Sequence, residues 1–93
     1  MSREETRTRV VQLLGRKRIV GGHKKQVETV KNWFPTDEHG TTEAVIREMI
    51  RNPKAPLEGY GGSRDNVRLT SIEDAKRYIV ERGGELPWRL RDE

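Results

Sequence analysis

The sequence predicts one α+β domain that is mainly α-helical, and three observations support this class. Apolar residues recur at helical spacing in four stretches of the chain. Two short runs that alternate apolar and polar residues, at 57–60 and 67–70, flank a glycine-rich loop and predict a β-hairpin. The chain has 93 residues, of which 31% are hydrophobic and 37% are charged, so it can form one small core.

The first helix is expected to begin at residue 3, because Ser2 and Glu5 fit the Ser-x-x-Glu capping box. Its apolar stripe consists of Val10, Val11, Leu13 and Leu14. Residues 19–20 follow as a short strand or a buried linker, and two glycines then interrupt the chain. A second helix is expected from about residue 23 to residue 33, where Pro35 ends it.

A third helix is expected at about 42–51, with Thr41 or Thr42 as its cap. Its inward face consists of Val45, Ile46, Met49 and Ile50. After the hairpin, Thr70 or Ser71 caps a fourth helix that runs to about residue 82. Residues 84–93 form a tail that is either flexible or part of an interface, and it offers Leu86, Trp88 and Leu90 as cover for the core or for a partner.

The net charge of +4 is unevenly distributed along the chain. Residues 1–31 carry nine Lys and Arg against three Glu, whereas residues 32–93 carry ten Lys and Arg against twelve Asp and Glu. A basic first third favours a polyanionic partner, although an ordinary solvated surface is the alternative.

Several classes of function are disfavoured. We expect no metal site, because His23 and His39 lack ligand-like spacing, and no enzyme activity, because no nucleophile–base pattern or phosphate-binding loop is present. No cofactor and no small-molecule substrate are apparent. The chain has no cysteine and no apolar run of membrane-span length, so we expect a cytoplasmic protein without membrane association.

The order helix, possible strand, helix, helix, hairpin, helix resembles the winged helix-turn-helix family of small prokaryotic, archaeal and viral regulators. The resemblance covers about residues 5–82 and rests on element order. It implies a single winged-helix domain over 1–93, with a three-helix core, a β-hairpin wing and a C-terminal helix. The link at 34–41 is longer than the tight turn of the simplest helix-turn-helix.

The resemblance makes the third helix, at about 42–51, the recognition helix in the DNA major groove. Arg47 would then read a guanine through its O6 and N7 acceptors, and Arg51 would contact DNA or support the helix exit at Asn52 and Pro53. Thr41 and Thr42 would bind a phosphate at the helix N-terminus. An ion pair between Glu43 and Arg47, four residues apart, is the competing interpretation of Arg47.

The hairpin at about 57–70 would be the wing, with Arg64 at its tip and Arg68 on its second strand as contacts to DNA. An ordinary turn, with Arg64 compensated by Asp65, is the alternative. Lys24 and Lys25 are expected in the first turn of the second helix, where cations are unfavourable, so phosphate contact is the proposed reason for them.

The leading hypothesis is therefore a protein that binds double-stranded DNA, acts as a transcriptional regulator and forms a homodimer on a palindromic site. One alternative is a winged-helix module for protein interactions in a replication or transcription assembly, which Glu43 and Glu48 on the third helix favour. Another is an RNA-binding protein, which the basic first third permits.

Overall fold

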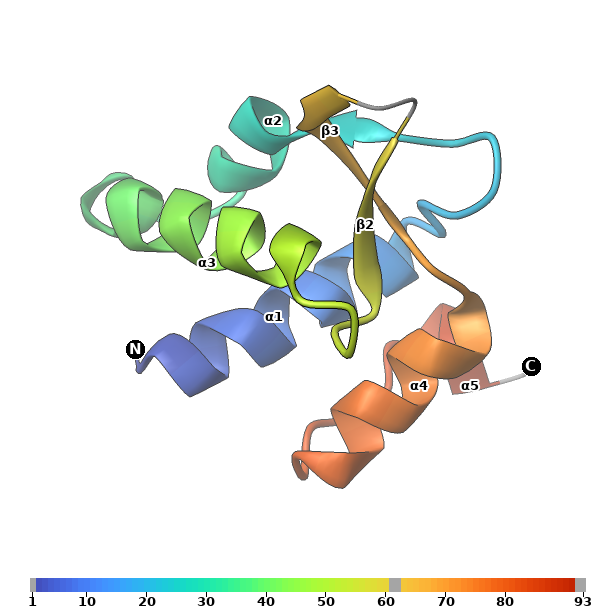
Figure 1. The fold of residues 1–93 in the computed structure, drawn as a ribbon. Helices are drawn as coiled ribbons and strands as arrows, with labels where there is room; N and C mark the ends of the chain where they lie inside the picture. Colours follow the sequence, from blue (N-terminus) through green and yellow to red (C-terminus); the bar gives the residue numbers. More distant parts are fainter. Residues whose placement is uncertain (1, 61–62, 92–93) are drawn as a thin grey trace.

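Two layers, a group of helices and a small antiparallel sheet, make up the structure, which is a computed structural model (Figure 1). It describes residues 2–60 and 63–91, without the side chains of Ser63, Arg64, Arg89 and Arg91. The elements, in chain order, are α1 (Arg3–Arg16), β1 (Lys25–Gln26), α2 (Val27–Lys31), the 3-10 helix η1 (Thr36–Glu38), α3 (His39–Arg51), β2 (Leu57–Tyr60), β3 (Ser63–Leu69), α4 (Ile72–Glu81) and α5 (Trp88–Arg91). The predicted class, α+β and mainly α, is confirmed.

The sheet has the strand order β1-β3-β2, and both pairings are antiparallel. The β2–β3 hairpin lies within the predicted range, with Leu57 opposite Leu69 and an irregularity after Gly59. However, β3 begins at Ser63, four residues before the predicted second run, so part of the expected loop belongs to the strand. Val67 and Leu69 of β3 are fully buried, so the central strand turns one face to the helices. In Figure 1, α3 lies to the left of the hairpin and α4 to its lower right.

Helix α1 begins as the capping box predicts, because the Ser2 hydroxyl accepts the Glu5 N–H and the Glu5 carboxylate accepts the Ser2 N–H. Most of its apolar stripe is buried, but Leu13 is only half-buried. The helix packs against both α3 and α4. It is therefore the support on which the other long helices are placed.

The second helix is shorter than predicted, and the strand lies elsewhere. Lys25 and Gln26 pair with Val67 and Asn66 of β3, so helix α2 begins only at Val27. The edge of β3 that faces away from β2 has backbone N–H and C=O groups that need hydrogen-bond partners. Pairing with these groups outweighs the helical pattern of the local sequence. Val20, expected in a short strand or a buried linker, forms an isolated bridge to Leu69.

Helix α3 begins three residues earlier than predicted, because the 3-10 helix η1 leads directly into it. The expected inward face is confirmed for Val45, Ile46 and Met49, which are buried, while Ile50 is half-buried. Helix α4 begins at its expected cap, since the Ser71 hydroxyl accepts the Asp74 N–H at 3.0 Å.

The tail packs on α1 through Leu90, which is fully buried and therefore covers the core as one interpretation expected. Gly15 of α1 makes this contact possible, because a Cβ there would lie 2.7 Å from Leu90 Cδ1. Gln12 of α1 also donates its side-chain N–H to the carbonyl oxygen of Glu85 at 2.8 Å. Trp88 in the same segment is 76% exposed.

Candidate nucleic-acid interface

The outer side of α3 carries two glutamates, and each is paired with cations of neighbouring elements. Glu43 lies 3.4 Å from Lys31 Nζ of α2. Glu48 accepts from Arg3 at 3.2 Å and from Arg7 at 3.0 Å, both on α1. The hydrogen bond from Arg47 lowers the pKa of Glu43, and the hydrogen bond from Arg7 lowers that of Glu48. Both carboxylates are therefore ionised at neutral pH, and both have a compensating charge beside them.

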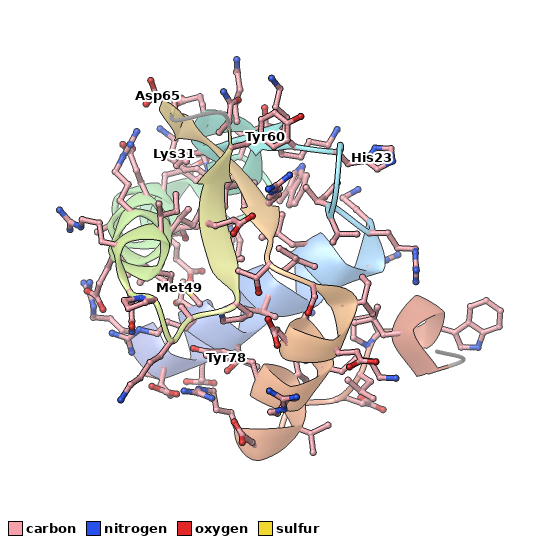
Figure 2. All side chains as sticks on the ribbon, turned by 45° about the vertical axis from the view of Figure 1, so that its right-hand side comes forward. His23, Lys31, Met49, Tyr60, Asp65 and Tyr78 are labelled. Atoms are coloured by element: carbon pink, nitrogen blue, oxygen red, sulfur yellow. The ribbon has the colours of Figure 1, made fainter. Side chains whose placement is uncertain are left out.

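Arg47 bridges α3 and the hairpin. Its Nε donates to Glu43 at 3.1 Å, which is the predicted ion pair four residues apart, and its Nη2 lies 3.3 Å from Asp65 Oδ1 of β3. Asp65 lies at the outer end of the hairpin in Figure 2 and is 81% exposed. Arg47 is thus near the surface, but its guanidinium already binds two carboxylates.

The two threonines at the start of α3 differ from the prediction. Thr42 is fully buried, and its hydroxyl has no hydrogen-bond partner among the described residues, so the expected phosphate contact through this side chain is wrong. The cause is the earlier helix start, which places Thr42 one turn inside α3 and on its inner face. Thr41 is exposed and remains within the first turn.

Arg51 is exposed in the last turn of α3, and no ion pair within residues 2–60 and 63–91 includes it. Lys24 and Lys25 do not lie in a helix, so the argument from helix-dipole repulsion does not apply to them. Lys25 belongs to β1, and Lys24 lies just before it, with Nζ 4.9 Å from the centre of the Tyr60 ring. Lys24 is exposed at this edge of the sheet, and Lys25 is half-buried.

Arg68 is engaged within the sheet rather than turned to solvent. Its Nε donates to Glu58 at 2.7 Å, its Nη1 donates to the carbonyl oxygen of Gly21, and its guanidinium lies 4.8 Å from the Tyr60 ring centre. Arg64 is placed in β3 by its backbone, but its side chain lies outside the described residues. The predicted contact between Arg64 and Asp65 therefore lies outside the described side chains, and among these Asp65 pairs with Arg47.

Sequence reasoning missed the pairing of cations with aromatic rings. Lys24 and Arg68 lie over the ring of Tyr60, and Lys17 Nζ lies 4.9 Å from the ring centre of Trp33. The partners come from different elements, so no local spacing could have indicated them. Each of these two rings therefore lies beside at least one cation.

Within the part of the chain that the structure describes, no three His, Asp or Glu residues gather as metal ligands, and no helix is both long and apolar enough to cross a membrane. A comparison with protein-family models, curated proteins and solved structures finds no significant match for this chain.

Proposed function

We propose that the chain is a winged helix-turn-helix domain that binds double-stranded DNA as a transcriptional regulator. Two features of its topology support the fold assignment. The elements follow the order α1-β1-α2-α3-β2-β3, and the strand that precedes α2 returns to pair with the second strand of the hairpin. In this assignment α3 is the recognition helix and the β2–β3 hairpin is the wing.

The observation that carries the functional proposal is the contact between α3 and the hairpin through Arg47 and Asp65. Because of this contact, the outer sides of the helix and of the hairpin form adjacent surfaces. A duplex that received α3 in its major groove would meet the hairpin on the neighbouring backbone. Arg51 on α3 and Lys24 beside the hairpin would be the leading phosphate contacts, because both are exposed.

The glutamates of α3 are weaker evidence for a protein-interaction module than their sequence positions suggest. Glu43 faces Lys31 and Arg47, and Glu48 faces Arg3 and Arg7, so neither carboxylate presents an isolated negative charge. Their repulsion of DNA phosphates is reduced accordingly. Arg47 would then contact DNA by exchanging Asp65 for a phosphate oxygen or a guanine edge.

The test is a titration of the full chain with random-sequence duplex DNA between 50 and 200 mM salt, where the slope of log affinity against log salt reports about 0.9 per phosphate neutralised. We expect Arg51→Ala and Lys24→Ala each to reduce this slope by about one unit. Arg77→Ala, which removes a 66% exposed cation from α4, is the matched control and should leave the slope unchanged.

Absence of duplex binding at the lowest salt, or equal losses for Arg51→Ala and Arg77→Ala, would refute the proposal. Tighter binding of RNA than of duplex DNA of the same sequence would favour the RNA-binding alternative. Selection from a random duplex pool then tests sequence preference. A palindromic consensus, with two chains per duplex in sedimentation, is the result that a homodimeric regulator requires.

A further inference from the structure

A groove of about 490 Å³ lies between α1 and the segment that leads into α5. Its lining residues include Arg9, Leu13, Arg16, Leu86, Pro87 and Trp88. This volume is within the range of roughly 300–1,000 Å³ that is typical of ligand pockets. The groove therefore offers space for part of another molecule.

The walls of the groove are held in place by contacts on both sides of it. Gln12 binds the Glu85 carbonyl oxygen, and Leu90 is buried against Gly15, so the tail is attached to α1 before and after the groove. A preformed site loses less conformational entropy on binding than one that must first assemble. The groove is thus suited to binding without rearrangement.

The groove has an apolar floor and an aromatic rim. Leu13 and Leu86 pack against the core but are only half-buried, and Trp88 is 76% exposed. Among the described residues, Trp88 and Val80 are the two exposed large apolar side chains. Tryptophan is enriched among the residues that dominate protein–protein binding energy. An apolar side chain of a ligand that packed on Leu13 would also cover the exposed ring of Trp88.

Two arginines stand at the ends of this floor. Arg9 and Arg16 are exposed, and neither takes part in an ion pair among the described residues. They are seven residues apart on α1, which is two helical turns or about 10.5 Å along one face. By contrast, Arg3 and Arg7 of the same helix are both paired with Glu48. Each end of the groove therefore carries an arginine without an ion pair among the described residues. Glu85 also lines the groove, so two arginines stand against one carboxylate and the lining keeps a positive excess.

We propose that this groove binds an acidic amphipathic segment of a partner protein. In the bound state an apolar side chain of the segment packs between Leu13 and Trp88, and carboxylates on either side of it pair with Arg9 and Arg16. The charge of the groove selects this occupant. A second copy placed groove to groove would bring the same arginines against each other, and a nucleic acid offers no apolar side chain to cover Leu13, Leu86 and Pro87.

The position of the groove on α1 allows this partner to bind together with DNA. Arg7 contacts Glu48 and therefore marks the side of α1 that faces α3. Arg16 follows nine residues later, and at about 100° per residue this is half a turn around the helix axis. The groove thus lies on the side of α1 that is turned away from α3.

The test pans a phage-displayed library of random 16-residue peptides against the full chain. We expect enriched peptides to carry an aromatic or large aliphatic residue between two acidic positions. Arg9→Glu with Arg16→Glu should lower their binding at least about tenfold, as expected for the loss of two ion pairs and the gain of repulsion. Lys54→Glu with Arg77→Glu, which makes the same change in charge elsewhere, is the control and should have little effect.

The site is then identified by the NMR signal of the Trp88 indole N–H, assigned by its loss in Trp88→Ala. An enriched peptide should shift this signal, and circular dichroism should show that each variant is folded. The proposal is overturned if no peptide is enriched, if the enriched peptides lack carboxylates, or if the control pair of substitutions has the same effect as the groove pair. A dimer that depends on Trp88, or a shift of its indole signal by duplex DNA or RNA, also overturns it.

Discussion

Because the tail packs on α1 at Gly15, we expect the effect of Gly15→Ala on the free energy of unfolding to depend on Leu90. The substitution should destabilise the native chain and stabilise a chain in which Leu90 is truncated to alanine. Glycine within a helix is less favourable than alanine by roughly 0.5–1 kcal/mol, so the substitution alone would stabilise an isolated α1. In the folded chain, however, the new methyl group would lie 2.7 Å from Leu90 Cδ1, which is too close for two carbon atoms. The Leu90 side chain must then leave its buried position, either by rotation or by movement of the tail.

The magnitude follows from the burial of Leu90, which is complete. Withdrawing a leucine from the core costs about 1.5–3 kcal/mol, and the helix gain offsets roughly 0.5–1 kcal/mol of it. Gly15→Ala should therefore destabilise the native chain by roughly 0.5–2.5 kcal/mol. Leu90→Ala alone should cost about 2–3 kcal/mol, near the lower end for buried leucines because a terminal helix can settle into the space. In the Leu90→Ala background, Gly15→Ala should stabilise by about 0.5–1 kcal/mol.

The assay is urea unfolding of the four chains, followed by circular dichroism, with the free energies compared as a double-mutant cycle. We expect Gly15→Ala to lower the free energy of unfolding of the native chain and to raise it in the Leu90→Ala background. Equal stabilisation in both backgrounds would refute the reasoning, because it would mean that α5 does not rest on Gly15. The groove beside Trp88 would then lose one of its two attachments.

Three further predictions concern the helices. Thr42→Val should stabilise the chain by about 1 kcal/mol in urea unfolding, because a methyl group of similar size replaces a buried hydroxyl that has no partner among the described residues. Destabilisation would mean that the hydroxyl does have a hydrogen-bond partner. The lowered pKa values of Glu43 and Glu48 imply a contribution to stability that is present above pH 4.5, their ordinary pKa, and is lost as the pH falls below it. Glu48→Gln should therefore make the urea midpoint less dependent on pH in this range. An unchanged pH dependence would contradict the ion pairs. Ser71→Ala should cost about 1 kcal/mol through the loss of the α4 cap, with Ser71→Asp as the variant that retains stability in the same unfolding assay.

Features governed by nearest neighbours could be predicted from the sequence. The capping interactions of Ser2 and Ser71, and the hairpin alternation around Val67, each depend on residues a few positions apart, and the structure contains all three. The predicted start of the second helix was wrong for the opposite reason. Lys25 and Gln26 have a helical context, but their partners are forty residues away on β3, and local propensity carries no information on that pairing.

The candidate interface was less predictable than the fold. The pair between Glu43 and Arg47 follows from helical spacing, but the contacts of Arg47 with Asp65 and of Glu48 with Arg7 require knowledge of how α3 packs. Thr42 shows the same limit in another way. A shift of the helix start changes its predicted position from the exposed first turn to the buried face, and sequence patterns locate helix ends less reliably than helices themselves.

The arginines of α1 show how packing assigns different roles to chemically identical residues. Arg7 points to α3, where it compensates Glu48 and so reduces the negative charge on the helix proposed to enter DNA. Arg9 and Arg16 lie on the other side of the same helix, where no carboxylate of the described residues pairs with them. A basic first third therefore does not have to form one polyanion-binding surface. Part of its charge pairs with Glu48 of α3, and part is left at the groove for the proposed acidic partner.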